Sequence, residues 1–357
     1  MSINILQVLT KAVDMKGTDV HITVSLPPII RVNGNLQAFG EEKLTQEDTK
    51  DITRQILNDE QLEILEQKGE VDLSYVIPNL SRFRVNAYKQ RSSYTLAIRA
   101  IWIKVPTIDE LGFPQIFKSL ALKPRGMVLV TGPTGSGKST TLAAMVNHIN
   151  MNRKCHVLTL EEPIEYLHRH GESMINQREV GSDTLSFVSA LRAALREDPD
   201  VILVGEMRDL ETIATAITAA ETGHLVLSTL HTTGAAQSID RVIDVFPPYQ
   251  QQQIRIQLSS VLEGIISQQL LAKADGRGLV AAFEIMITNN AISNLIREGK
   301  THQIPTIMQT NLKTGMKMMD HSLSELVKTG LITREQAMVR CVDMEMLKRY
   351  MVNAGAM

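Results

Sequence analysis

Cysteine is scarce in this sequence, and the two that it has, Cys155 and Cys341, lie 186 residues apart. Two cysteines can build neither a disulfide framework nor a four-cysteine zinc site. A small disulfide-rich secreted domain is therefore excluded, and we expect a reducing, intracellular setting.

Long apolar runs are also missing. No run approaches the roughly 18 apolar residues of a membrane-spanning helix. The first residues, MSINILQVLTKAVDMKG, place apolar side chains at helical spacing and do not resemble a signal peptide. We expect a soluble, cytoplasmic chain that reaches a membrane only through a partner.

The sequence also lacks an excess of charge of one sign. The chain has 37 basic and 39 acidic residues, a net charge of −2, which gives no support to nucleic acid as the main partner. We find no internal repeat and no low-complexity tract. A length of 357 residues favours two domains, and 43% hydrophobic residues suffice for their cores.

A glycine-rich loop is the most informative feature that is present. Residues 132–139 read GPTGSGKS, between an expected strand at 127–131 and an expected helix at 140–150. Glycines let backbone N–H groups converge on a phosphate, Lys138 reaches the β- and γ-phosphates, and the Ser139 hydroxyl ligates Mg²⁺. We therefore expect ATP and Mg²⁺ as ligands. The residues expected to bind the nucleotide are Gly132, Pro133, Thr134, Gly135, Ser136, Gly137, Lys138, Ser139 and Thr140.

Residues 1–103 are expected to form an α+β domain. A helix is predicted near residues 5–13, and a second from Thr45 to Gln67, with Thr45 as N-cap and Asp48 three places on. Asn33-Gly34 predicts a hairpin turn. Strands are predicted at 20–24, 29–32, 36–39, 71–76, 83–88 and 94–100. Residues 104–114, with two prolines and a glycine, read as a linker.

Residues 115–357 are expected to form the second domain, in which strands alternate with helices. Such alternation predicts a parallel sheet with helices on both faces. We predict the tail from Gln250 to be helical. Further strands are predicted at 156–160, 201–204 and 225–230, and helices at 185–196, 209–221 and 234–242.

Carboxylates follow two of the predicted strands. Glu206 follows a buried run, at the end where α/β sheets place ligands, and would hold Mg²⁺ through a water; the alternative is a solvated acid. Glu161, Glu162 and Glu165 lie within five residues, and one of them is a candidate for the base that orients the attacking water. The alternative is an ordinary acidic loop.

Two histidines, His224 and His231, flank the predicted strand at 225–230. A histidine near a γ-phosphate can donate a hydrogen bond to it and so sense its presence. The alternative is a pair of satisfied core histidines. Metal ligation is disfavoured because no third ligand is spaced nearby.

Four stretches in order, GPTGSGKST, LEEPIEYLH, LREDPDVILVGEMRD and ETGHLVLSTLHT, resemble the type II/IV secretion ATPase superfamily over essentially the whole chain. The resemblance implies a RecA-like P-loop ATPase domain behind a smaller N-terminal PAS-like α+β domain. It implies a homohexamer with ATP between subunits. It also places the catalytic base at Glu165, Glu206 at the metal, and His224 and His231 near the nucleotide.

Arginines complete the site that the resemblance implies. Arg84 and Arg99 match the family's paired arginines, which act across the subunit boundary on the charge of the transferring phosphoryl group; the alternative is a pair of solvated strand residues. Two positions depart from the family pattern. Glu162 replaces an Asp, and Ser293 replaces the first Arg of the segment AIRNLIRE, here Ala291–Glu298. That helix is also expected to pack Ile292, Leu295 and Ile296 into the core.

Within the superfamily the chain resembles the pilus retraction ATPases. The expected function is a motor that hydrolyses ATP to disassemble a type IV pilus for twitching motility, acting on an inner-membrane platform protein, indirectly on the pilus, and not on nucleic acid. A companion retraction ATPase is an open alternative. An extension or type II secretion ATPase is less favoured because those relatives commonly carry a four-cysteine element and a longer N-terminal region. A RecA-like nucleic-acid translocase is the alternative from another class.

Overall fold

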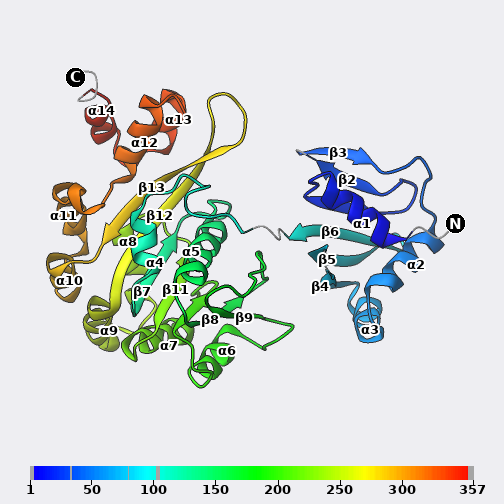
Figure 1. Ribbon diagram of the computed structural model, residues 1–357, viewed down its shortest axis with the longest axis horizontal. Coiled ribbons are helices and arrows are strands. Elements are labelled where there is room, and N and C mark those ends of the chain that lie inside the picture. The colour runs from blue at the N-terminus through cyan, green and yellow to red at the C-terminus, as the bar shows by residue number, and fades with distance from the viewer. Residues whose placement is uncertain (1–3, 33, 79, 102–104, 353–357) are drawn as a thin grey trace. The chain divides into compact units, whose positions relative to one another are not determined.

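The computed structural model describes residues 4–32, 34–78, 80–101 and 105–352. The chain divides into two compact units, Met1–Lys104 together with Glu165–Leu167, and Val105–Ile164 together with His168–Met357. Each unit has its own sheet (Figure 1). The hydrophobic clusters of the two units do not share residues.

The first unit contains a six-stranded antiparallel sheet in the order β3-β2-β1-β6-β5-β4. Its six strands correspond to the six that the sequence predicts, and no end is shifted by more than two residues. Val32 pairs with Asn35 across the predicted hairpin turn, of which Asn33 lies outside the described residues. The strands are β1 (Asp19–Ile22), β2 (Ile29–Val32), β3 (Asn35–Ala38), β4 (Glu70–Ile77), β5 (Ser81–Gln90) and β6 (Ser93–Ile101).

Three helices, α1 (Ile5–Asp14), α2 (Gln46–Ile56) and α3 (Asp59–Lys68), share the core of this unit with the inward residues of the sheet. Thr45 caps α2 and forms the predicted capping box with Asp48. The prediction of one helix over 45–67 is wrong. Leu57 is extended, and the Asn58 side chain caps a second helix, because an Asn with a Gln three residues later forms its own capping box.

The second unit contains a seven-stranded sheet in the order β13-β12-β7-β11-β10-β8-β9. All neighbours are parallel except β12 and β13, so the sheet is mixed rather than purely parallel as predicted. β9 was not predicted. The strands are β7 (Gly126–Thr131), β8 (His156–Glu161), β9 (Met174–Glu179), β10 (Val201–Val204), β11 (Leu225–Leu230), β12 (Leu262–Ala272) and β13 (Leu279–Ile287).

Helices cover both faces of this sheet, as the sequence predicts (Figure 1). Along β7, Met127 and Leu129 pack into one core while Val128 and Val130 pack into the other. The first core also contains residues of α6 (Phe187–Ala194), α7 (Leu210–Glu221), α8 (Ala235–Asp244) and α9 (Pro248–Val261). The second contains residues of α4 (Ile116–Ala121) and α5 (Lys138–Asn152).

The prediction of a wholly helical tail is wrong, because α9 is followed by the hairpin β12–β13. The run LEGIISQQLLA of β12 has few exposed positions, so it lacks the alternation that marks a half-exposed strand. Short helices follow, and α10 buries Ile292 and Ile296 as predicted. They are α10 (Asn290–Arg297), α11 (Ile304–Thr310), α12 (Met319–Lys328), α13 (Arg334–Arg340) and α14 (Met344–Val352), with 3-10 turns at Thr301–Gln303 and Leu312–Thr314.

The segment predicted as a linker begins at Lys104, which lies outside the described residues. Further along it, Ile108 is 2% exposed and packs into a core of the second unit, with Leu111 and Phe113 against the same core. No helix in the described part of the chain is both long enough and apolar enough to cross a membrane.

Candidate nucleotide site

The loop after β7 has the backbone that a phosphate cradle requires. Gly132, Gly135 and Gly137 have φ angles of 144°, 77° and 87°, a region that disfavours side chains. A Cβ on Gly132 would lie 2.3 Å from the Gln268 carbonyl oxygen. Glycine is therefore required here both by conformation and by space.

The side chains of the loop fit a polyphosphate. Lys138 is buried, and its Nζ donates to the carbonyl oxygens of Gly132 and Pro133 at 2.9 and 3.0 Å, which holds a cation within the loop. Ser136 Oγ is buried and has no hydrogen-bond partner among the described residues. No acidic residue lies in the first turn of α5. A phosphate at this helix N-terminus would bind the N–H groups and the orphaned hydroxyl.

The parallel strands bring several predicted residues to the same edge of the sheet. β8, β10, β11 and β7 are neighbours and run in one direction, so their carboxyl ends meet. Gly132 follows β7, His231 follows β11, Glu206 follows β10 by two residues, and Glu161 ends β8. This edge gathers a phosphate loop, a histidine and two carboxylates.

Glu206 is the acid with the most defined surroundings at this edge. Its side chain is 16% exposed, and its two oxygens accept from Arg208 Nε at 2.7 Å and His231 Nε2 at 3.4 Å. Among the described residues, no group of three His, Cys, Asp or Glu side chains forms a ready metal site. A Mg²⁺ ion here would thus rely on phosphate oxygens and water, with Ser139 and Glu206 as the protein groups available to it.

The structure separates the two predicted histidines. His224 precedes β11, and its carbonyl accepts from the N–H of Gly126, where β7 begins. Its ring Nδ1 lies 2.9 Å from the Ala219 carbonyl at the end of α7. Within its own chain His224 therefore lies at the edge of the sheet opposite the phosphate loop, because the strand spans about 3.3 Å per residue. Its place near a nucleotide held between subunits stays a prediction.

The three glutamates at the end of β8 and just after it differ in their surroundings. Glu161 accepts from Thr159 Oγ1 at 2.6 Å and from Gln177 Nε2 at 3.2 Å, whereas Glu162 and Glu165 are exposed. Glu165 lies four residues beyond β8, in the segment Glu165–Leu167 that groups with the first unit. The residue before it, Ile164, donates its N–H to Glu179 at 2.9 Å. Glu162 and Glu165 are thus the acids of this run that remain exposed, and Glu165 as the base stays a prediction.

In the first unit the structure brings Arg84 and Arg99 together, opposite each other on β5 and β6. Arg99 Nε donates to Asp19 at 2.9 Å, and Arg84 Nε lies 3.9 Å from Asp72. Burial would raise the pKa of Asp19, but hydrogen bonds from Thr18 and Arg99 and the charge of Arg99 hold that pKa below its ordinary value. Both arginines remain at least half exposed.

Two buried residues at this edge were missed by the sequence analysis. Gln268 of β12 contacts the phosphate loop, and Glu179 of β9 anchors the backbone before Glu165. Gln268 lies in a stretch that was expected to be helical, and β9 was not predicted at all. No local pattern marks either residue, because each acts through strand pairing between distant segments.

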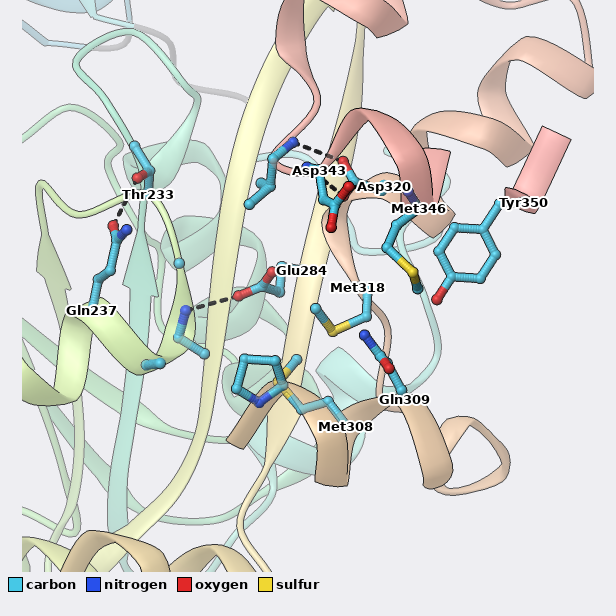
Figure 2. Close-up of a pocket in the computed structure, with 15 residues that line it drawn as sticks. Thr233, Gln237, Glu284, Met308, Gln309, Met318, Asp320, Asp343, Met346 and Tyr350 are labelled. Atoms are coloured by element: carbon cyan, nitrogen blue, oxygen red, sulfur yellow. Dashed lines mark hydrogen bonds between the residues drawn. The ribbon is translucent and has the colours of Figure 1, made fainter. Parts of the chain in front are cut away.

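A pocket of about 270 Å³ lies elsewhere in the second unit, between β13, the start of α8 and helices α11, α12 and α14 (Figure 2). Glu284 accepts from the N–H of Ala235 at 2.8 Å, and Asp320 accepts from Val342 and Asp343 at 2.8 and 2.9 Å. Burial raises the pKa of both carboxyl groups. The contacts explain the two acids as ties between segments of the chain.

Comparison with known proteins agrees with this geometry. Residues 2–339 match the family model described as "Type II/IV secretion system protein". The chain is 52% identical over 318 residues to a twitching motility protein of Neisseria gonorrhoeae, covering 89% of this chain and 85% of that one. It is 49% identical over 334 residues to the type IV pilus retraction ATPase PilT of Pseudomonas aeruginosa, covering 94% and 97%.

Solved structures agree as well. A crystal structure of the pilus retraction motor PilT with bound ADP is 45% identical, with a TM-score of 0.91, covering 97% of this chain and 99% of that one. The Legionella pneumophila ATPase DotB is 26% identical with a TM-score of 0.81, covering 99% and 96%.

Fold and site together define a RecA-like P-loop ATPase, with a parallel core sheet and a glycine loop at the carboxyl end of its central strand. The chain belongs to the type II/IV secretion system protein family.

Proposed function

We propose that this chain is a motor ATPase that retracts type IV pili, working as a ring of six copies. One observation carries the proposal: the glycine loop presents an orphaned hydroxyl and a buried lysine at the edge where His231 and Glu206 meet. The near full-length similarity to proteins named for twitching motility and pilus retraction supports the biological assignment.

The chemistry is the in-line attack of water on the γ-phosphorus of ATP. Residues Gly132–Thr140 bind the phosphates, and Lys138 stabilises their charge. Ser139, and Glu206 through a water, would hold a Mg²⁺ ion, which would supply positive charge to the phosphate oxygens. Glu165 orients the attacking water, and His231 donates toward the γ-phosphate.

The site is completed by a neighbouring subunit. Arg84 and Arg99 belong to the first unit and are exposed, so they are available to the nucleotide of the next copy in the ring. Loss of the γ-phosphate then changes how one copy holds the next, which is the mechanical step. The ring acts on an inner-membrane platform protein at the base of the pilus, from the cytoplasmic side.

Sequence similarity favours pilus retraction over the roles of the other ATPases in the family. The chain is 49% identical to PilT but 38% identical to the type IV pilus ATPase PilU of the same bacterium. The type II secretion protein E of Aeromonas hydrophila matches only 44% of this chain and 29% of its own length. The net charge of −2 does not favour a nucleic-acid translocase.

Deletion of the gene in its host tests the proposal. We expect cells with excess pili that do not retract and do not twitch, and a plasmid copy should restore motility whereas the Lys138→Ala copy should not. Bald cells would instead identify an extension motor. Purified protein should hydrolyse ATP as a hexamer, and ATPase activity that persists in Lys138→Ala would refute the site.

A further inference from the structure

Gln268 is buried beside the phosphate loop without belonging to it. It lies on β12, which runs parallel to β7, and its neighbour Ser267 pairs with Thr131, the last residue before the loop. The Gln268 side chain is 1% exposed. An amide at such a position must bond within the protein, because an unpaired buried amide is costly.

Both ends of that amide are occupied. Gln268 Nε2 donates to the carbonyl oxygen of Ser136 in the loop. Its Oε1 accepts from Thr141 Oγ1 at 2.6 Å, in the first turn of α5. One side chain of β12 therefore ties the glycine loop to the helix that follows it.

The bond to Ser136 fixes the direction of a peptide group. In a trans peptide the carbonyl of one residue and the N–H of the next point in opposite directions. With the Ser136 carbonyl turned toward Gln268, the N–H of Gly137 points the other way, away from β12. A flipped peptide would offer a carbonyl oxygen to a phosphate, which repels it.

Two of the three loop glycines, Gly132 and Gly137, lie against Gln268. A Cβ on Gly132 would lie 2.3 Å from the Gln268 carbonyl oxygen, and one on Gly137 would lie 2.7 Å from Gln268 Nε2. A second buried bond, between Thr131 Oγ1 and Ser267 Oγ at 2.7 Å, joins the strands one residue earlier. Two adjacent residues of β12, Ser267 and Gln268, thus bind the end of β7 and the loop that follows it.

We propose that Gln268 is a positioning residue for nucleotide binding: it holds the Ser136–Gly137 peptide with its N–H available to the phosphates. The inference rests on ATP binding at the loop, as in the proposed function, but not on pilus retraction. It assigns to β12 a part in the nucleotide site that the loop motif alone does not reveal.

Gln268→Met tests this in the full-length protein, because Met has a similar volume but neither donates nor accepts strongly. We expect the Kd for ADP and the KM for ATP to rise about tenfold or more, while kcat falls less than about threefold. Gln269→Met is the matched control. Gln269 is the next residue on the strand, and its Nε2 donates to the carbonyl oxygen of Arg340 rather than to the loop. The Kd of the Gln269→Met variant for ADP should stay within about twofold of wild type.

Gln268→Glu makes the ADP affinity depend on pH if Gln268 positions the loop, whereas a purely structural role predicts no such dependence. A neutral carboxyl group can donate to Ser136 and accept from Thr141 as the amide does, whereas a carboxylate cannot donate. Burial raises the pKa of such an acid, so its ADP affinity relative to wild type should recover as the pH falls from about 8 to about 6.

Thr141→Val supplies a second variant in case Gln268→Met folds poorly. It should raise the Kd for ADP about threefold alone and add nothing in the Gln268→Met background, because both changes break one bridge. Wild-type affinity in Gln268→Met, a pH-independent ratio for Gln268→Glu, or full additivity would each overturn the inference. A wild-type protein that does not bind ADP would instead overturn the proposed function on which the inference rests.

Discussion

Arg84 and Arg99 lie directly opposite each other on adjacent antiparallel strands, so two positive side chains share one face of the first unit's sheet. Like charges in this arrangement are destabilising by themselves. The register continues from Arg99 to Asp19, and Arg84 has Asp72 nearby, so each arginine has its own acid. Because both arginines remain at least half exposed, the pair is suited to bind an anion that both share.

Arg84→Gln and Arg99→Gln should each lower kcat for ATP hydrolysis about 100-fold or more, while the protein still folds. Arg99→Gln should lower the melting temperature slightly, because it removes the bond to Asp19. An arginine that reaches the transferring phosphoryl group from a neighbouring subunit contributes mainly to the transition state. Steady-state ATPase assays and thermal melts of the same preparations measure both effects. Arg54→Gln, on the helical side of this unit, should behave as wild type, and equal activity in all three variants would exclude an arginine role.

Glu206→Gln should retain nucleotide and lose turnover. The change keeps the size of a side chain that contacts Arg208 and His231 but removes its charge. We expect hydrolysis to fall about 100-fold or more, and ATP affinity to change less than about threefold, because the charge acts on the metal during the reaction. Glu211→Gln, which alters an exposed pair with Arg192, is the control. Normal turnover in Glu206→Gln would remove this residue from the site.

Substitution of the two histidines should have different effects on the preference of the protein for ATP over ADP. His231→Ala removes a ring from the loop edge and should reduce the preference for a slowly hydrolysed ATP analogue over ADP by about fivefold. His224→Ala removes a ring bonded to Ala219 at the other edge, so the same preference should stay within about twofold. Calorimetric titration with both nucleotides measures the ratio. An equal loss in both variants would contradict the separation.

The sequence was sufficient for the parts of the site that are local. The glycine loop is predictable because phosphate binding by backbone N–H groups requires glycines at fixed spacing, and the observed φ angles follow from it. The position of Glu206 at this edge was predictable because a carboxylate soon after a buried strand in an α/β sheet lies at the ligand edge. The same rule separates the histidines: His224 precedes a parallel strand, which places it at the other edge.

Two of the features that the sequence does not predict depend on contacts between distant segments. The sequence pattern does not identify the hairpin β12–β13, because burial on both faces removes the alternation that marks a strand. The contact of Gln268 with the loop is not predictable from the sequence. Gln268 and Ser136 are 132 residues apart, and only the pairing of β12 with β7 brings them together. The split between α2 and α3 was visible in principle, because Asn58 and Gln61 form a capping box.

His168 should make the protein less stable below neutral pH. Burial lowers the pKa of this histidine from 6.5 to about 4. Between these values the unfolded chain binds more protons than the folded one, so stability is complete above pH 6.5 and is lost as the pH falls toward 4. From pH 7.5 to pH 5 the loss should be about 2 kcal/mol in urea titrations followed by circular dichroism. His168→Gln, which cannot titrate, should lack this component, whereas His302→Gln at an exposed turn should retain it. If wild type and His168→Gln lose equal stability over this range, the imidazole is not held neutral by burial.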